Sequence, residues 1–190
     1  MVDNVVNSML SIYRQQDKLP IWPLMSGETN QMPGYSSVPV IADAYLKGIR
    51  GYDAEKALDA MIRSSNINKK GSDYYVAQGF IPSNIKRESV SCTLEYAYDD
   101  WAISRMAGAM GRDDVARALN YANVFDGSTC FFRGRGTDGN WSEPFEEFAT
   151  GRDYTEATPW HYRFFVPHDV NGLAGLFGSR EAFVRELDRL

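Results

Sequence analysis

The sequence predicts an all-α protein, and more specifically part of an (α/α)6 toroid built from helical hairpins with long loops at one end. Apolar residues recur at helical spacing in roughly eight segments, and no stretch shows the alternation of a half-buried strand. Short connections alternate with long ones that carry glycine, proline and aromatic residues. A solenoid of tetratricopeptide type is the competing arrangement, but the chain has no fixed repeat of about 34 residues. In a toroid the long loops meet at one mouth, where ligands bind.

The first part of the chain predicts three helices and one long loop. Residues 1–16 carry apolar side chains at three- and four-residue spacing, as on one face of a helix. Residues 17–37 contain three prolines and two glycines, which indicates a long ordered loop. Ser36 or Ser37 then caps a second helix, and Asp53 caps a third. These two helices are expected to form a hairpin with a short connection.

The remainder predicts one long helix between two long loops. Residues 64–88 lose the helical pattern, after which Ser89 or Ser91 opens the longest helix, whose broad apolar face indicates burial on more than one side. A helix starting at Asp113 is expected to pair with it as a second hairpin. A third long loop, residues 125–157, is rich in glycine, arginine and aromatic residues. Three shorter helices are predicted after this loop, starting at Thr158, Asp169 and Ser179.

Charge and cysteine content weigh against several classes of function. The formal net charge of -5 and the lack of a basic cluster argue against nucleic acids and anionic membranes as partners. No window approaches the length of a membrane span, and the first residues lack the features of a signal peptide, so localisation stays open. Cys92 and Cys130 are too few and too far apart for a zinc motif or a disulfide framework, so both are expected to be buried thiols.

Chemically active residues concentrate between Asp153 and Asp169, a stretch that reads DYTEATPWHYRFFVPHD and holds both histidines of the chain. Thr158 followed by Pro159 predicts a helix start, because threonine can accept from a free backbone amide and proline needs none. Glu156 therefore lies in the turn before a helix, among Tyr154, Trp160 and Tyr162. Aromatic faces would desolvate its carboxylate, raise its pKa and suit it to donating a proton. The alternative is a structural glutamate that complements the helix dipole.

Four long stretches together resemble one enzyme family. They are KLPIWPLMSGETNQMPGYSSVPVIADAYLKGIRGYDAEKA, SVSCTLEYAYDDWAISRMAGAMG, FFRGRGTDGNW and DYTEATPWHYRFFVPHDVNGLAGLFGSREAFVRELDRL. Similar motifs occur in this order in glycoside hydrolase family 92, the calcium-dependent exo-α-mannosidases. The resemblance covers nearly all 190 residues. It implies a toroidal catalytic domain that removes terminal α-linked mannose from glycans, often N-glycans, with inversion at the anomeric carbon.

Carried over residue by residue, the resemblance places the family's general acid on Glu156. It also implies that Trp160 lies near the sugar pocket. His161 either reaches the substrate or caps a hydrogen bond in the core. The chain departs from the family pattern at Pro159, where a small residue is usual, at His161, where glutamine is usual, and at Ser36, where histidine is usual. These departures affect the expected preference on the leaving-group side, while the acid itself is retained.

The loop from Arg133 to Trp141 is expected near the same sugar pocket. Arg135 or Arg133 could hold sugar hydroxyls through the planar donors of the guanidinium group. Ordinary salt bridges within the loop are the alternative. Both interpretations stay open from the sequence.

An inverting glycosidase needs a second carboxyl group about 6.5–9.5 Å from the acid. In the family this base is an aspartate far downstream, close to the calcium site, and Asp153, Asp169 and Asp188 do not match its motif. The resemblance therefore implies an internal segment, residues 1–190, which lacks the amino-terminal β-sandwich and the carboxy-terminal part of the toroid. Calcium would belong to the parent enzyme, with no metal ligands encoded in this chain, and the isolated chain is expected to be inactive. The parent's family is typically periplasmic or extracellular.

Two further expectations arise from an incomplete toroid. Apolar helix faces left uncovered would favour self-association. A non-catalytic helical carbohydrate-binding or interaction module is the alternative function. A different toroidal glycosidase or a polysaccharide lyase is a third option, although the net charge of -5 does not favour a lyase pocket for acidic sugars.

Overall fold

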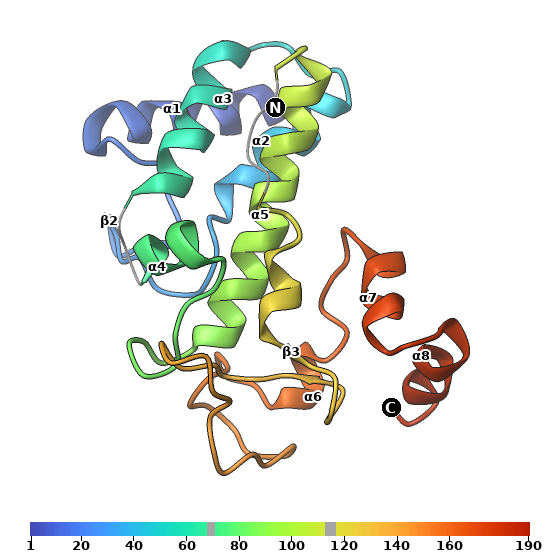
Figure 1. Ribbon diagram of the computed structural model, residues 1–190. Coiled ribbons are helices and arrows are strands. Elements are labelled where there is room, and N and C mark those ends of the chain that lie inside the picture. The colour runs from blue at the N-terminus through green and yellow to red at the C-terminus, as the bar shows by residue number, and fades with distance from the viewer. Residues whose placement is uncertain (68–70, 113–116) are drawn as a thin grey trace.

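The computed structural model describes residues 1–67, 71–112 and 117–190 and is rich in helix (Figure 1). Its helices are α1 (Val2–Gln16), α2 (Ser37–Leu46), α3 (Ala54–Asn66), α4 (Ser72–Gln78), α5 (Ser89–Ala109), a 3-10 helix (Asn120–Val124), α6 (Pro159–Tyr162), α7 (Val170–Leu176) and α8 (Arg180–Leu187). Two antiparallel strand pairs accompany them, β1 (Pro23–Leu24) with β2 (Gly27–Glu28) and β3 (Phe125–Asp126) with β4 (Phe131–Phe132).

The helical class predicted from the sequence is confirmed, but the expectation of no strands is wrong for these two pairs. Each strand is only two residues long, so no alternation of apolar and polar residues can appear in the sequence. The β1–β2 turn contains Met25 and Ser26 with φ of 52° and 70°. Two left-handed residues are typical of a tight hairpin turn, but they are usually glycine or asparagine, which explains why this turn was missed.

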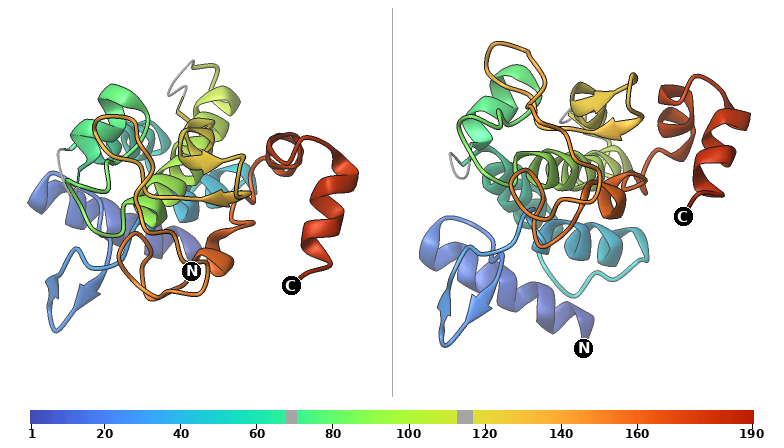
Figure 2. Two further views of the ribbon diagram at one scale, coloured as in Figure 1. Left: turned by 60° about the horizontal axis from the view of Figure 1, so that its bottom comes forward. Right: turned by 90° about the horizontal axis from the view of Figure 1, so that it is seen from below.

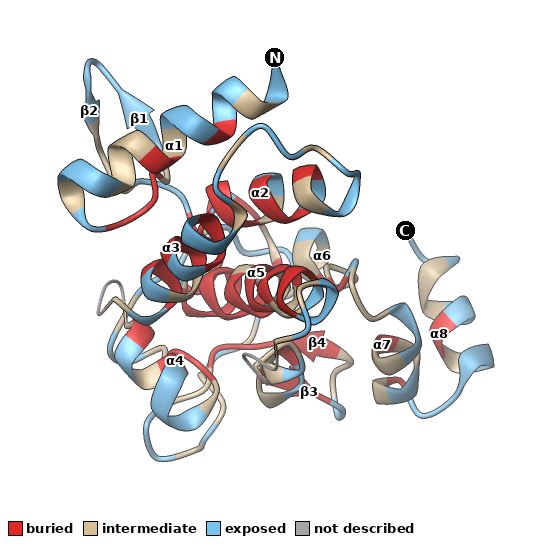
Figure 3. Cartoon of the chain, turned by 90° about the horizontal axis from the view of Figure 1, so that it is seen from above, coloured by how far each residue is buried: buried red, intermediate tan, exposed pale blue. Residues whose placement is uncertain are grey.

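Helix α5 is the centre of the structure. It packs against α2, α3 and the 3-10 helix, and Figures 1 and 3 show other elements around it and burial along its length. Fourteen of its 21 residues are buried, which confirms the burial on more than one side predicted from its apolar face. Leu94, Ile103 and Met106 are among its fully buried side chains, so replacing any of them with alanine would cost about 2–5 kcal/mol.

One hydrophobic core joins α1, α2 and α3 to α5. Helices α2 and α3 form the hairpin that the sequence predicts. Asp53 caps α3 as expected, since its carboxylate accepts a hydrogen bond from the Lys56 amide at 3.1 Å. Tyr35 and Tyr96 stack with ring centroids 4.3 Å apart and so attach the loop before α2 to α5.

A second core joins the first turns of α5 to the segment between the 3-10 helix and α8. It contains Val90, Leu94, Phe132, Tyr154 and Leu173, all buried. Figure 2 shows residues 125–157 gathered at one end of α5, with α7 and α8 to one side of the body. The chemically active stretch of the sequence therefore lies beside the start of α5.

The predicted loop over residues 64–88 is only partly correct. Helix α3 continues to Asn66, and α4 occupies seven of the residues that were expected to be loop. Helix α4 is bounded by Gly71 and Gly79, whose φ values of 80° and 85° suit glycine. Gly71 offers no capping side chain, so α4 has no local start signal, unlike the equally short α7, which begins after Asp169.

The helix predicted from Asp113 begins outside the described residues, and residues 117–124 do not form an α-helix. Residues 117–119 form a turn, and the 3-10 helix comes next. Arg117 Nε lies 2.8 Å from Oδ2 of the fully buried Asp100 on α5. A tertiary ion pair of this kind leaves no periodic signal in the sequence. The predicted helix at Thr158 is likewise a single turn, α6.

The cysteine prediction is confirmed for one residue of the two. Cys92 is buried, whereas Cys130 is half-buried, with a φ of 58° in the turn between β3 and β4. Neither cysteine forms a disulfide within the described residues. No helix within the described ranges is long and apolar enough to span a membrane.

Candidate functional site

Glu156 lies where the sequence predicts it, two residues before the cap of a helix. Thr158 caps α6, and the capping box is completed by His161. Glu156 is exposed, and its φ of 50° is left-handed, which is uncommon for a residue other than glycine. Its carboxylate therefore projects from a tightly turned backbone.

The aromatic shielding expected around Glu156 is not formed by Tyr154 or Trp160. Tyr154 is buried, and its hydroxyl donates to the carbonyl of Phe132 at 2.5 Å. The Trp160 ring packs edge-on against Phe131, with ring centroids 5.2 Å apart. Both side chains are engaged with β4, and Glu156 itself stays exposed.

The segment that carries Glu156 is attached to the start of α5. The carbonyl of Asp153 accepts from the amides of Val90 and Ser91 at 3.0 and 3.3 Å. The amide of Thr155 donates to the hydroxyl of Ser91 at 2.9 Å. The second contact joins residues 64 positions apart in the sequence, and together these bonds fix the backbone directly before Glu156.

His161 caps the start of α6 at the surface and does not cap a hydrogen bond in the core. Its Nδ1 accepts from the amide of Thr158 at 3.1 Å and lies 2.9 Å from the Thr158 hydroxyl, while the side chain as a whole is exposed. Trp160 and His161 line a shallow hollow of about 420 Å³ together with Phe164, Phe165 and Leu190. The structure thus brings these two predicted residues together on one surface.

Arg135 is occupied by its own loop. Its Nε donates to the carbonyl of Gly139 at 2.9 Å, and its Nη1 donates to the carbonyl of Asn123 at 3.2 Å. The guanidinium also lies 5.4 Å from the ring centroids of Phe80 and Trp141. Of the two interpretations of Arg135, this geometry favours the one in which it stabilises the loop.

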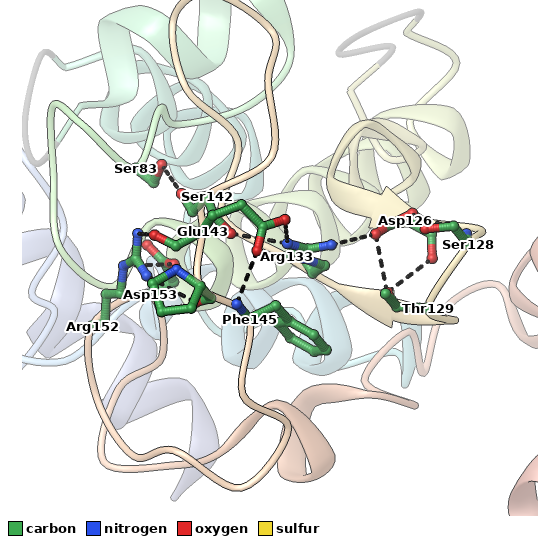
Figure 4. Close-up of polar contacts among 11 residues, drawn as sticks. Ser83, Asp126, Ser128, Thr129, Arg133, Ser142, Glu143, Phe145, Arg152 and Asp153 are labelled. Carbon is green, nitrogen blue, oxygen red and sulfur yellow. Dashed lines mark hydrogen bonds and ion pairs between the residues drawn. The ribbon is translucent and has the colours of Figure 1, made fainter.

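Arg133 is a buried side chain at the centre of a polar network that extends from the buried Asp126 to the exposed Glu143 (Figure 4). It forms ion pairs with Asp126 at 2.7 Å and Glu143 at 2.8 Å and donates to the carbonyl of Ser142 at 2.9 Å. Because only 5% of its surface is exposed, the geometry of Arg133 likewise favours stabilisation of the loop. Hydrogen bonds from Ser128 and Arg133 to Asp126 outweigh the effect of its burial and lower the pKa of that carboxyl.

A cavity of about 230 Å³ lies next to the Glu156 segment. Its lining includes Arg133, Asp153 and Pro159. Asp153 is buried, and burial raises its pKa, although nearby Arg152 opposes the shift. The Ser89 hydroxyl donates to Asp153 Oδ1 at 3.2 Å.

Three carboxyl groups on α5 were not predicted as candidate residues. Burial raises the pKa of Glu95 to about 7 and that of Asp100 to about 6, in the second case against the opposing effect of Arg117. Asp99 is buried as well, its pKa is raised by burial, and it accepts from the Tyr35 amide at 2.5 Å. Acidic residues four positions apart on an otherwise apolar helix were the sequence signal for Glu95 and Asp99.

The described residues do not assemble a metal site. Within residues 1–67, 71–112 and 117–190, no three histidine, cysteine, aspartate or glutamate side chains are grouped to hold an ion. Calcium in proteins takes six to eight oxygen ligands, with carboxylates prominent. The fit to calcium is therefore poor within these ranges, and no chemical step is assigned to a metal here.

Comparison with known proteins gives consistent matches. The model of the glycosyl hydrolase family 92 catalytic domain matches residues 1–190. A GH92 α-mannosidase from Bacteroides thetaiotaomicron, in complex with mannoimidazole, is 36% identical and superposes with a TM-score of 0.94, covering 99% of this chain and 27% of that chain. A GH92 inverting mannosidase from the same species is 34% identical, with a TM-score of 0.90 and coverage of 98% and 27%.

A sequence relative from a fungus agrees with these matches. An uncharacterized secreted glycosidase from Arthroderma benhamiae is 26% identical, over 96% of this chain and 29% of that protein. The chain thus spans less than a third of the length of each of these three relatives.

Proposed function

Because the chain belongs to glycosyl hydrolase family 92, we propose that it is a segment of an α-mannosidase catalytic domain and that Glu156 is the general acid. The two similar solved structures are mannosidases, which supports the substrate class. Since the chain spans 27% of those structures, we assign the activity to a longer protein that includes these residues. The toroidal arrangement of the helices belongs to the same proposal.

The observation that carries the proposal is the presentation of Glu156. Its carboxylate is exposed on a left-handed turn, and the residues directly before it are held by α5. An acid that protonates a glycosidic oxygen must be both accessible to the substrate and fixed in direction. Glu156 meets both requirements, whereas Asp153, the nearest other carboxyl in the sequence, is buried.

In the proposed reaction, the Glu156 carboxyl transfers its proton to the oxygen of the departing sugar while water attacks the anomeric carbon from the opposite face, with inversion. One of the similar structures is an inverting mannosidase, which supports this stereochemistry. The water-activating carboxylate and any calcium are assigned to the rest of the longer protein. Calcium bound there would help to hold and distort the sugar ring. The residues of this chain hold and move the proton at Glu156.

The test is Glu156→Gln in the longer protein. Glutamine keeps the size of the side chain but cannot donate a proton as a carboxylic acid does, so kcat for an α-linked mannobiose should fall by about 10²–10⁴-fold. Glu181→Gln, an exposed glutamate in the first turn of α8, is the matched control and should leave kcat unchanged. A Glu156→Gln enzyme with wild-type kcat would contradict the proposal.

The segment alone should release no mannose, because the resemblance places the base outside these residues. The measurement is mannose release by the purified 190-residue chain, with and without calcium. Calcium-dependent release from this chain would show that the acid, base and metal ligands are all within it.

A further inference from the structure

The backbone around Glu156 is held in an unusual conformation. Gly151, Arg152 and Glu156 all have left-handed φ values, 77°, 55° and 50° respectively. For residues with a side chain this region of conformational space is unfavourable and persists only where surrounding contacts impose it. The contacts that impose it therefore also set the direction of the Glu156 carboxylate.

The first turn of α5 supplies these contacts. The Glu88 amide donates to the carbonyl of Arg152 at 2.7 Å, and the amides of Val90 and Ser91 donate to the carbonyl of Asp153. Amides in the first turn of a helix have no partner within the helix. Here the segment before Glu156 provides the acceptors, so the rigid 21-residue helix becomes its support.

One side chain of α5 makes the contact closest to Glu156 in the sequence. The Ser91 hydroxyl accepts from the Thr155 amide at 2.9 Å, and the residue is 0% exposed. Thr155 directly precedes Glu156 and is itself buried. The Ser91 side chain also forms a hydrogen bond with Tyr162. Burial raises the pKa of Tyr162, and this hydrogen bond partly offsets the rise. Ser91 thus connects α5 to both sides of the Glu156 turn.

We propose that Ser91 is a positioning residue for Glu156: its hydroxyl fixes the Thr155 amide and thereby the left-handed turn that aims the carboxylate at the glycosidic oxygen. This inference rests on the proposed function of Glu156. Without the hydroxyl the Thr155 amide is buried and unpaired, and the turn relaxes toward an ordinary backbone conformation. The carboxylate then stays in the site but points in a wider range of directions.

The first test is Ser91→Ala in the longer protein, compared with Ser64→Ala. The two serines are matched, because the hydroxyl of Ser64 is also buried and accepts from a loop amide, that of Leu19, at 2.9 Å. Misplacement of a catalytic group by about 1 Å can cost on the order of 10²-fold. We expect Ser91→Ala to lower kcat on an α-linked mannobiose by about 10–100-fold with little change in KM, and Ser64→Ala to leave both constants near wild type.

Leaving-group dependence separates positioning of the acid from general damage. A mannoside with a dinitrophenyl leaving group needs little protonation, so Ser91→Ala should affect it much less. Ser91→Thr keeps an acceptor oxygen and should recover part of the activity, because its additional methyl group enters a fully buried site. Equal losses on both substrates, or equal effects of Ser91→Ala and Ser64→Ala, would overturn the inference.

The hydrogen bond can also be measured without activity. In the 190-residue chain, amide hydrogen exchange at Thr155 should accelerate by roughly tenfold or more in Ser91→Ala and remain unchanged in Ser64→Ala. An unchanged Thr155 amide in Ser91→Ala would overturn the inference by itself. If Glu156→Gln lowers the rate more on the mannobiose than on the dinitrophenyl mannoside while Ser91→Ala lowers both rates equally, the proposed function is supported and the role of Ser91 is refuted. If Glu156→Gln lowers both rates equally, both proposals are refuted.

Discussion

Glu95 should make the stability of this chain fall as the pH rises. Its side chain extends from the first third of α5, is mostly buried, and forms no hydrogen bond or ion pair among the described residues. Burial raises its pKa from 4.5 to about 7. Between these two values the native state keeps the proton while the unfolded state has lost it, so unfolding becomes easier with each pH unit.

The size of the effect is set by the pKa. A rise from 4.5 to about 7 corresponds to about 3 kcal/mol of native-state penalty for the ionised form at pH 8. Glu95→Gln removes the charge but keeps the shape of the side chain. The variant should therefore match wild type near pH 4.5 and exceed it by about 1–3 kcal/mol at pH 8.

Urea denaturation followed by circular dichroism at pH 5, 6, 7 and 8 measures this difference. Other titrating groups are present in both proteins, but the charge of Glu95 also raises the pKa of Asp99, so the difference between the two curves measures Glu95 together with its coupling to Asp99. Glu181→Gln serves as the exposed control and should differ from wild type by less than about 1 kcal/mol at every pH, the size of a carboxylate interaction with a helix N-terminus. A Glu95→Gln difference that is independent of pH, or a variant less stable than wild type at pH 8, would show that burial does not raise the pKa of Glu95 as described.

Three further predictions concern stability and association. Asp100→Asn leaves Arg117 beside an uncharged and buried partner, so urea denaturation at pH 7.5 should show a free energy of unfolding lower by about 3–5 kcal/mol. The control Asp43→Asn removes only a surface pair with Lys47 and should lower it by less than about 1 kcal/mol. A methyl group at Gly134 would overlap the buried Asp153 carboxylate, so Gly134→Ala should cost about 1–3 kcal/mol, while Gly127→Ala, in open space, should change stability by less than about 0.5 kcal/mol. The chain should self-associate through exposed apolar residues, which include Phe148, Val170, Val184 and Leu190. Light scattering that shows a monomer at high concentration would contradict this prediction.

The spacing of apolar residues was sufficient to predict a helix where that helix is long and extensively buried. Helix α5 was predicted because its apolar residues cover more than one face, and the structure places it in the centre. The α2–α3 hairpin was predicted from the Asp53 cap and from glycines, whose geometry is local. The predicted serine cap of α2 is wrong, because Ser36 makes no capping hydrogen bond and the Ser37 hydroxyl donates to the carbonyl of Pro20. Helix α4 was missed because it is short and starts after Gly71, which has no capping side chain, and the strand pairs were missed because two residues carry no readable period.

In the candidate site, features set by neighbouring residues could be predicted from the sequence, and features set by distant contacts could not. The position of Glu156 before a helix start is determined by neighbouring residues and could be predicted. The direction of Tyr154 could not, because its hydroxyl is fixed by the carbonyl of Phe132, 22 residues away. The contact between Ser91 and Thr155 spans 64 residues and exists only after the loop has packed on α5.

The role of Glu156 as general acid is best judged by how the rate depends on the leaving group when this residue is changed. Wild type and Glu156→Gln would be assayed on aryl α-mannosides whose leaving phenols span a wide range of pKa. We expect the Glu156→Gln rate to fall steeply as the phenol becomes more basic, while the wild-type rate changes little, because Glu156 donates the proton that the poor leaving group needs. Parallel dependence in the two enzymes, with an equal loss on every substrate, would contradict the assignment of Glu156 as the acid.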